Sequence, residues 1–177
     1  MALSTTIMEL RERARGLREA ELDRPRVIED WRRDIGGVYD VVRGALKAYE
    51  ADGSATIGFE EVEVSEETLG TETYERLVID VVGRRIVVCP VARFIVGGTG
   101  RIDMYRGNRP AEDHRVFIVR GFSGPGFDPN SWLIEQKGEA PAGGQGPSPT
   151  LLRGKRRYTP LGPSSVEAAV DHLLNLP

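Results

Sequence analysis

Apolar residues recur at intervals of three and four positions near the start of the chain. Four of them are Ile7, Leu10, Ala14 and Leu17. This spacing places their side chains on one face of an α-helix, which turns once in about 3.6 residues. Most of the charged residues nearby fall outside that face. The pattern therefore predicts an amphipathic helix over residues 4–21.

A second helix is predicted directly after the first. Asp23 is suited to cap its N-terminus, and Pro25 is tolerated in the first turn. The apolar alternation then continues over three heptads, which is typical of a seam between packed helices. The residues of this seam are Ile28, Trp31, Ile35, Val38, Val42, Ala45 and Tyr49.

The seam has two alternative uses. It can pack on the first helix and on a sheet of the same chain, or it can form an interface with a partner or a second copy. Under the second alternative, all seam residues except Ala45 are candidate partner-binding residues. Gly36, Gly37 and Gly44 lie in the same helix and each costs about 1 kcal/mol relative to Ala. They indicate either a close approach of another backbone or a kink at Gly36-Gly37.

The longest apolar-rich stretch, residues 74–106, predicts a sheet because β-branched residues and turn signals alternate along it. Gly83-Arg84 can form a two-residue hairpin turn with Gly in the first central position. Residues 77–82 would then pair antiparallel with 85–96. The turn at 97–100 would return the chain into a third strand, which gives a meander. Pro90 lacks an N–H group, so we expect it at a bulge, a strand end or a sheet edge.

Further strands are predicted on both sides of this meander, at residues 56–64, 115–120, 131–137 and 151–158. The first has an acidic solvent face, and we expect it to form a solvated edge followed by a loop at 65–71. Residues 138–150 contain no large apolar side chain, which predicts a mobile loop. Ser164 or Ser165 can cap a final helix, and Ser164 with Glu167 has the spacing of a capping box. The apolar stripe of that helix is Val166, Ala169, Val170, Leu173 and Leu174.

These elements predict one domain of the α+β class over residues 1–177. A helical arm at 1–51 precedes an antiparallel meander sheet of five to seven strands at 55–160. A C-terminal helix at 164–176 packs on the sheet. A chain of 177 residues is long enough to enclose one hydrophobic core.

Composition narrows the classes of protein that fit. The net charge of −3 gives no overall positive field for nucleic acid or an anionic membrane, so we expect neither as a partner. No stretch is long and apolar enough for a membrane helix or a signal peptide. Cys89 is the only cysteine, which excludes an internal disulfide and favours a cytoplasmic location. Its apolar neighbours indicate an inert core thiol, the alternative being a reactive one.

The sequence holds no established catalytic motif. Neither the Gly-x-Ser-x-Gly nor the His-Glu-x-x-His pattern occurs. The glycines at 97–100 lack the Lys and the following helix of a phosphate-binding loop. His114 follows two acidic residues, but a single histidine in such a cluster is weak evidence for a metal, and His172 lies in the final helix. We therefore expect no cofactor and no metal.

One combination has a chemical logic. Asp128 followed by Glu135 and Lys137 resembles the sparse pattern of restriction-endonuclease-like nucleases. The resemblance implies that the two carboxylates hold Mg²⁺ while Lys137 stabilises charge on the phosphate. Glu135 and Lys137 would project from the same side of a strand, as that chemistry requires.

A basic run near the C-terminus is a candidate anion-binding site. Its cations are Arg153, Lys155, Arg156 and Arg157. The alternative is that they pair with the acidic stretch at 60–75, within one chain or between two.

Together these features favour a non-enzymatic module that binds another protein or a second copy of itself. The extended helical seam supports this interpretation, and the lack of assembled catalytic groups is consistent with it. The alternative is a Mg²⁺-dependent nuclease that uses Asp128, Glu135 and Lys137.

Overall fold

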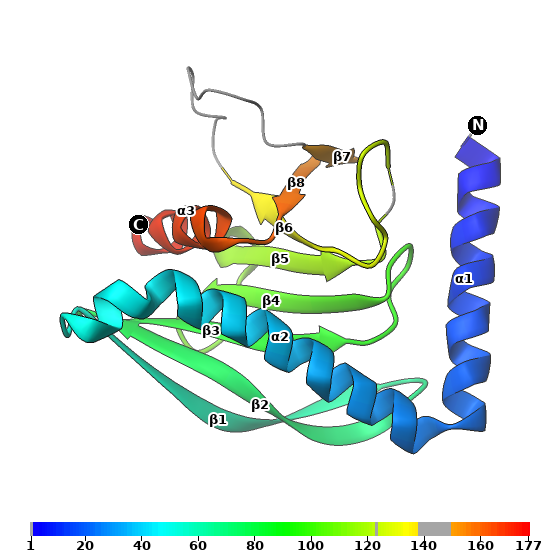
Figure 1. Cartoon of the computed structure of the whole chain (residues 1–177), viewed down its shortest axis with the longest axis horizontal. Helices are drawn as coiled ribbons and strands as arrows, with labels where there is room; N and C mark the ends of the chain where they lie inside the picture. Colours follow the sequence, from blue (N-terminus) through cyan, green and yellow to red (C-terminus); the bar gives the residue numbers. More distant parts are fainter. Residues whose placement is uncertain (1, 123, 138–149) are drawn as a thin grey trace.

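A computed structural model describes residues 2–122, 124–137 and 150–177. A single antiparallel sheet of eight strands carries two helices on one face, and a third helix stands at one end of the sheet (Figure 1). The α+β class is confirmed, with one strand more than the upper expected number. The predicted mobile loop lies outside the described residues except for Thr150.

Two long helices occupy the N-terminal region, as predicted. They are α1, Ala2–Leu22, and α2, Arg24–Ala51. Asp23 caps α2, since its side-chain oxygen accepts a hydrogen bond from the N–H of Arg26 at 3.4 Å. The helix runs unbroken through Gly36, Gly37 and Gly44, and no atom of the described chain lies within 4 Å of where their Cβ atoms would be. The expected close approach of another backbone is therefore wrong within this chain.

The strands follow one another across the sheet almost in chain order. Their bounds are β1 Ala55–Glu66, β2 Gly70–Val81, β3 Arg84–Ala92, β4 Gly100–Arg106, β5 Arg115–Arg120, β6 Trp132–Gln136, β7 Leu151–Arg153 and β8 Arg156–Pro160. The spatial order is β1-β2-β3-β4-β5-β6-β8-β7, and every pair of neighbours is antiparallel. A short 3₁₀ turn, Glu112–His114, precedes β5, and α3, Pro163–Leu174, closes the fold.

The first hairpin is longer than predicted. β1 and β2 pair in unbroken register from Ala55 opposite Val81 to Glu66 opposite Gly70. The loop expected at 65–71 shrinks to a tight turn because the ladder extends through its flanks. β1 is an edge strand of the sheet, so the expected acidic edge is confirmed.

The turn between β2 and β3 is displaced by one residue from its predicted position. Val81 pairs with Arg84, so Val82 and Gly83 are the two central residues. Their φ angles are 49° and 77°. A turn with positive φ at both central positions matches the right-handed twist of the two strands, and this preference places Gly83 second.

Two further details of the sheet test the sequence patterns. The register of β3 against β4 shifts between Pro90 and Ala92, so the proline lies at an irregularity of the ladder, which fits the first of the three expected positions, a bulge, a strand end or a sheet edge. The segment expected as one strand at 151–158 is instead a hairpin, β7 and β8, that turns at Gly154 with φ of 62°. The glycine permits this left-handed turn, and the extra strand follows from it.

The main core lies between the sheet and the two helices α2 and α3. Trp31, Val38 and Val42 of α2 are fully buried against apolar side chains of the sheet. Trp31 also stacks on Trp132, with ring centroids 6.0 Å apart. The hydroxyl of Tyr39 donates to the carbonyl of Glu75 at 2.6 Å. The α2 seam therefore packs within its own chain.

The final helix buries the predicted stripe, although Leu174 remains partly exposed. Its cap differs from the prediction, because Gly162 is the N-cap residue. The N–H of Gly162 donates to the Ser165 hydroxyl at 2.9 Å, in place of the expected box of Ser164 and Glu167. Among the described residues, no helix combines the length and the apolar character that crossing a membrane requires.

Candidate functional site

The face of the sheet opposite α2 and α3 carries a line of charged and aromatic side chains. Strand pairing brings one residue of each strand into this line, which we call the transverse row. From β1 to β7 in spatial order its members are Glu60, Arg76, Cys89, Asp103, Phe117, Glu135, Tyr158 and Leu151. Side chains alternate between the faces of a strand, so the row points away from the helices that contact neighbouring residues such as Leu77 and Met104.

Two carboxylates of the row are buried in the middle of the sheet. Asp103 is 3 % exposed and receives two hydrogen bonds from Arg101, at 2.7 and 2.8 Å, while Arg115 lies 3.5 Å away. Glu135 is 5 % exposed and lies 3.1 Å from Lys137 and 3.3 Å from Arg156. Burying a carboxylate is costly unless cations are paired with it in this way.

The third carboxylate repeats the arrangement at the exposed end of the row. Glu60 accepts hydrogen bonds from Arg76 and Arg85, each at 2.7 Å. The bonds from these two arginines hold the pKa of Glu60 below its ordinary value, with Arg85 the larger contributor. Each of the three carboxylates thus lies between two cations.

The ring of Phe117 lies at the centre of the arginine side chains. The guanidinium carbons of Arg101 and Arg156 are both 4.2 Å from the ring centroid, and that of Arg115 is 4.9 Å away. The N–H of Phe117 also donates to Glu135 at 3.2 Å. The stacking and the carboxylates together restrain the arginines, so their remaining N–H groups are held in place before any ligand binds.

Cys89 lies in the row and is only partly buried, on the polar side of the sheet and not in the main core. Burial is the main cause that raises the pKa of its thiol, and the nearby Asp103 adds to this effect. The thiol is therefore protonated at neutral pH and poorly suited to act as a nucleophile. The inert character expected from the sequence is consistent with this environment.

The charges of this face suit the binding of an anion. Among the described residues, six cations share three carboxylates on this face: Arg76, Arg85, Arg101, Arg115, Lys137 and Arg156. Their side chains are between 22 % and 45 % exposed, so solvent and ligands reach them. The result is a locally positive surface on a chain whose net charge is −3.

The structure brings together two of the three residues of the nuclease pattern. Glu135 and Lys137 lie on the same side, as predicted. Asp128 is exposed in a turn, where its carboxylate accepts a hydrogen bond from the N–H of Asn130 at 2.9 Å. Among the described residues, no group of three His, Cys, Asp or Glu side chains is arranged to hold a metal ion.

The basic run separates into different contacts. Arg156 belongs to the transverse face, and Arg153 pairs with Glu9 of α1 at 2.8 Å. Lys155 lies exposed in the β7–β8 turn, and Arg157 pairs through its strand with Gln136. For Arg153 and Arg156, the expected pairing with residues 60–75 of the same chain is wrong.

The candidate partner-binding residues of α2 are mostly enclosed. Ile28, Trp31, Ile35, Val38 and Val42 are buried within the chain, and only Tyr49 is exposed, at 44 %. They can reach a partner only if the core opens, because the sheet occupies their surface.

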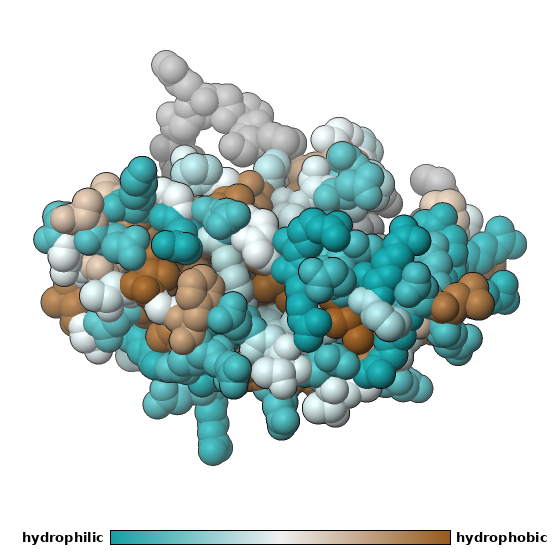
Figure 2. Space-filling model, turned by 60° about the horizontal axis from the view of Figure 1, so that its bottom comes forward, coloured by the Kyte–Doolittle hydropathy of each residue, from teal (hydrophilic) through white to brown (hydrophobic). Residues whose placement is uncertain are grey.

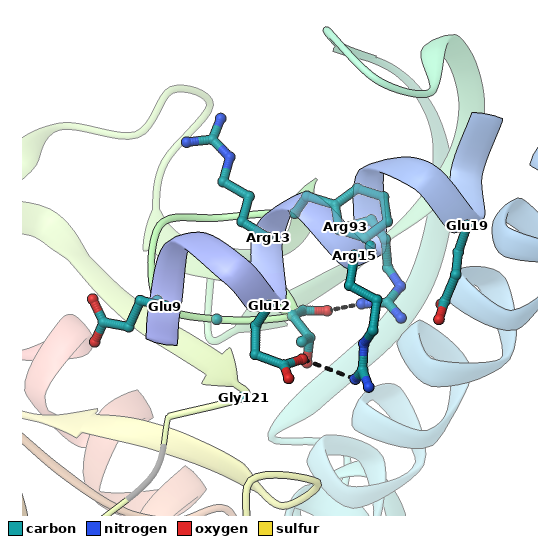
Figure 3. Close-up of a pocket in the computed structure, with 12 residues that line it drawn as sticks. Glu9, Glu12, Arg13, Arg15, Glu19, Arg93 and Gly121 are labelled. Atoms are coloured by element: carbon teal, nitrogen blue, oxygen red, sulfur yellow. Dashed lines mark hydrogen bonds and ion pairs between the residues drawn. The ribbon is translucent and has the colours of Figure 1, made fainter. Parts of the chain in front are cut away.

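A separate hollow of about 130 Å³ lies between α1 and the segment that joins β3 to β4 (Figure 3). Acidic and basic side chains of α1 line it together with Arg93, and Phe94, Thr99 and four glycines complete the lining. Arg93 donates a hydrogen bond to the carbonyl of Thr99, so its guanidinium is engaged within the segment that joins β3 to β4. Mixed charges and an internal bond of this kind favour packing over ligand binding.

Sequence reasoning missed Asp103, its two arginines and Phe117. The alternation of Arg101 and Asp103 within one strand was a local signal for a polar sheet face. The row itself depends on the register of all eight strands, which a linear sequence does not display.

Comparisons of the chain with protein-family models, curated proteins and solved structures find no match.

Proposed function

We propose that the protein is a non-enzymatic binding module that holds an acidic segment of a protein partner on its transverse face. The observation that carries this proposal is that, within the described part of the chain, six restrained cations pair with three carboxylates. Arginine clusters recognise acidic peptide motifs through charge-assisted hydrogen bonds, which are stronger than neutral ones.

Because the arginines are already restrained, this face is better suited to bind a ligand than a set of freely solvated arginines would be. An exposed arginine loses much side-chain entropy when a ligand fixes it. Arg101 is already held by Asp103 and by the ring of Phe117. Part of that ordering is therefore complete before the ligand arrives, which lowers the free-energy cost of binding.

The charge pattern favours a polypeptide over a nucleic acid. Each carboxylate of the row lies between two cations, so a continuous phosphate backbone would meet repulsion at each carboxylate. The acidic β1–β2 hairpin adjoins one end of the row and extends that repulsion. A peptide with spaced acidic residues avoids both.

A fluorescence anisotropy titration tests the proposal. The probe is a labelled peptide in which Glu alternates with Ser and Gly, and the reference probe carries Lys in place of Glu. The test variant is R76Q/R115Q/R156Q, which leaves one cation on each carboxylate and so preserves the fold. The control variant is R26Q/R33Q/R43Q, which removes the same charge from exposed positions on α2.

We expect the acidic probe to bind the wild-type chain more tightly than the lysine probe, and the test variant to weaken this binding about tenfold. The control variant should bind as wild type does. Equal binding of both probes, or an equal loss in both variants, would overturn the proposal. If sedimentation shows concentration-dependent dimers that the test variant loses, the acidic segment belongs to a second copy of the chain.

A cleavage assay addresses the nuclease alternative. Because Asp128 is engaged in its own turn, we expect no Mg²⁺-dependent cleavage of DNA or RNA by the purified protein. Cleavage that disappears in a folded E135A variant would replace the binding function with an enzymatic one.

A further inference from the structure

Most of the apolar stripe of α1 is exposed to solvent, although Leu17 is half-buried. Leu3 is 73 % exposed, Ile7 40 % and Leu10 54 %, and Ala14 is exposed as well. Brown apolar side chains stand out among the charged ones at the right-hand end of Figure 2, where α1 lies. These residues repeat at intervals of three and four, so they form one continuous line along the helix.

The helix contacts the body of the protein through a different face. Ala20 is 1 % exposed and belongs to a small cluster with Ile28 and Leu69. A Cβ atom at Gly16 would lie 2.5 Å from the ring of Phe94. Glu9 pairs with Arg153 at 2.8 Å. The small residues permit this close packing, and it leaves the apolar stripe without a partner in the described chain.

Arginines flank the exposed stripe. With the stripe at the a and d positions of a heptad, Arg11 and Arg18 occupy e positions and Arg13 a g position. None of the three makes an ion pair among the described residues. Figure 3 shows Arg13 directed away from the paired side chains of Glu12 and Arg15.

We infer that α1 is a docking helix for an acidic amphipathic helix of a partner protein. An acidic helix would cover the apolar stripe and place carboxylates beside Arg11, Arg13 and Arg18. Opposite charges at e and g positions determine which helices pair in this way. This surface is distinct from the transverse face, so it can function whether or not that face binds a ligand.

Two other occupants fit the stripe less well. A second copy of α1 would bring arginine against arginine in either the parallel or the antiparallel orientation, and like charges at these positions repel. An anionic membrane prefers a wide apolar face. Apart from Met8, which is 60 % exposed beside it, the stripe on α1 is a line of residues separated by three or four positions, which is typical of a helix pair.

A binding experiment on the full chain tests the inference. The probes are two labelled peptides of about three heptads, both with Leu at a and d positions. One carries Glu at e and g, and the other carries Lys. Anisotropy measured at low and high salt should show the acidic peptide binding at least tenfold more tightly, with a preference that shrinks as salt rises.

Charge reversal and stripe disruption provide the test variants. R11E/R13E/R18E should reverse the preference toward the lysine peptide, and I7D/L10D should weaken the acidic peptide by more than tenfold. The control is R43E/K47E, which reverses charges at exposed positions on α2 and should behave as wild type. Circular dichroism checks that each variant remains folded.

Three results would overturn the inference. The first is equal binding of both peptides, or binding that the stripe variant does not weaken. The second is a dimer in sedimentation that I7D/L10D dissociates, which would assign the stripe to a second copy. The third is binding to vesicles containing anionic lipid, lost in I7D/L10D, without binding of either peptide.

Discussion

At the residue scale, glycines in the two long helices have opposite roles. Gly37 and Gly44 of α2 face open space, and beyond the neighbouring backbone of the helix no described atom lies within 4 Å of the position of an added Cβ. Gly16 of α1 lies against the ring of Phe94, where an added Cβ would approach to 2.5 Å. The same substitution should therefore stabilise one helix and disturb the packing of the other.

We predict that G37A and G44A each raise the free energy of unfolding by about 1 kcal/mol, because Ala restricts the unfolded chain and favours the helix. G16A should have the opposite sign and loosen α1 from the body. Urea denaturation followed by circular dichroism measures the first effect, and limited proteolysis within α1 measures the second. A loss of stability in G37A would indicate that this face of α2 packs against something in solution.

At the element scale, α2 is the scaffold of the main core and not an exposed arm. Val38 and Val42 contact the sheet and have no exposed surface. The apolar stripe of α1 has the same spacing in sequence but lies in solvent. Sequence periodicity identifies such a stripe without revealing whether it is covered by the same chain.

We predict that V38E/V42E unfolds the protein, since two unpaired charges in this core cost more than about 4 kcal/mol. The I7D/L10D variant of α1 should retain a wild-type circular dichroism spectrum and melting temperature within a few degrees. Thermal melts of the two variants, recorded under the same conditions, test this difference in stability. A folded V38E/V42E protein that elutes as a smaller species would show that α2 contributes to an interface instead.

Local patterns predicted the helices and most strands because their signals lie within a few neighbouring residues. The turn at Val82 and Gly83 was misplaced by one position, since only the twist of paired strands selects the residue with positive φ. Glu135 and Arg156 were noted separately, one as a catalytic candidate and the other as part of a basic run. Their contact with each other, and with Phe117, depends on strand register and was therefore not visible in the sequence.

At the scale of the whole molecule, four tyrosines are enclosed by the fold. They are Tyr39, Tyr74, Tyr105 and Tyr158. Burial is the main cause that raises the pKa of each phenol, and it raises that of Tyr74 to about 12. The folded state therefore retains protons that the unfolded chain releases near its ordinary pKa of about 10.

We predict that stability is constant with respect to these groups below about pH 9 and falls as pH rises above 10. The unfolded state then binds fewer protons than the folded state, so the free energy of unfolding decreases with pH. An ultraviolet titration should show phenolate absorbance appearing together with the loss of the circular dichroism signal. Early, non-cooperative ionisation of all four phenols in a folded protein would contradict the burial of these side chains.

Among the described residues, the order of the strands leaves two edges of the sheet, β1 and β7, and they are unequal in length. β7 has only three residues, whereas β1 presents twelve whose outward N–H and C=O groups could template a foreign strand. A long exposed edge strand promotes aggregation unless charged side chains prevent it from pairing with another chain. Glu61 and Glu63 are exposed along β1, and Glu75 lies directly opposite Glu61. Any strand adding there would face a dense line of carboxylates, which protects the edge from pairing with another chain.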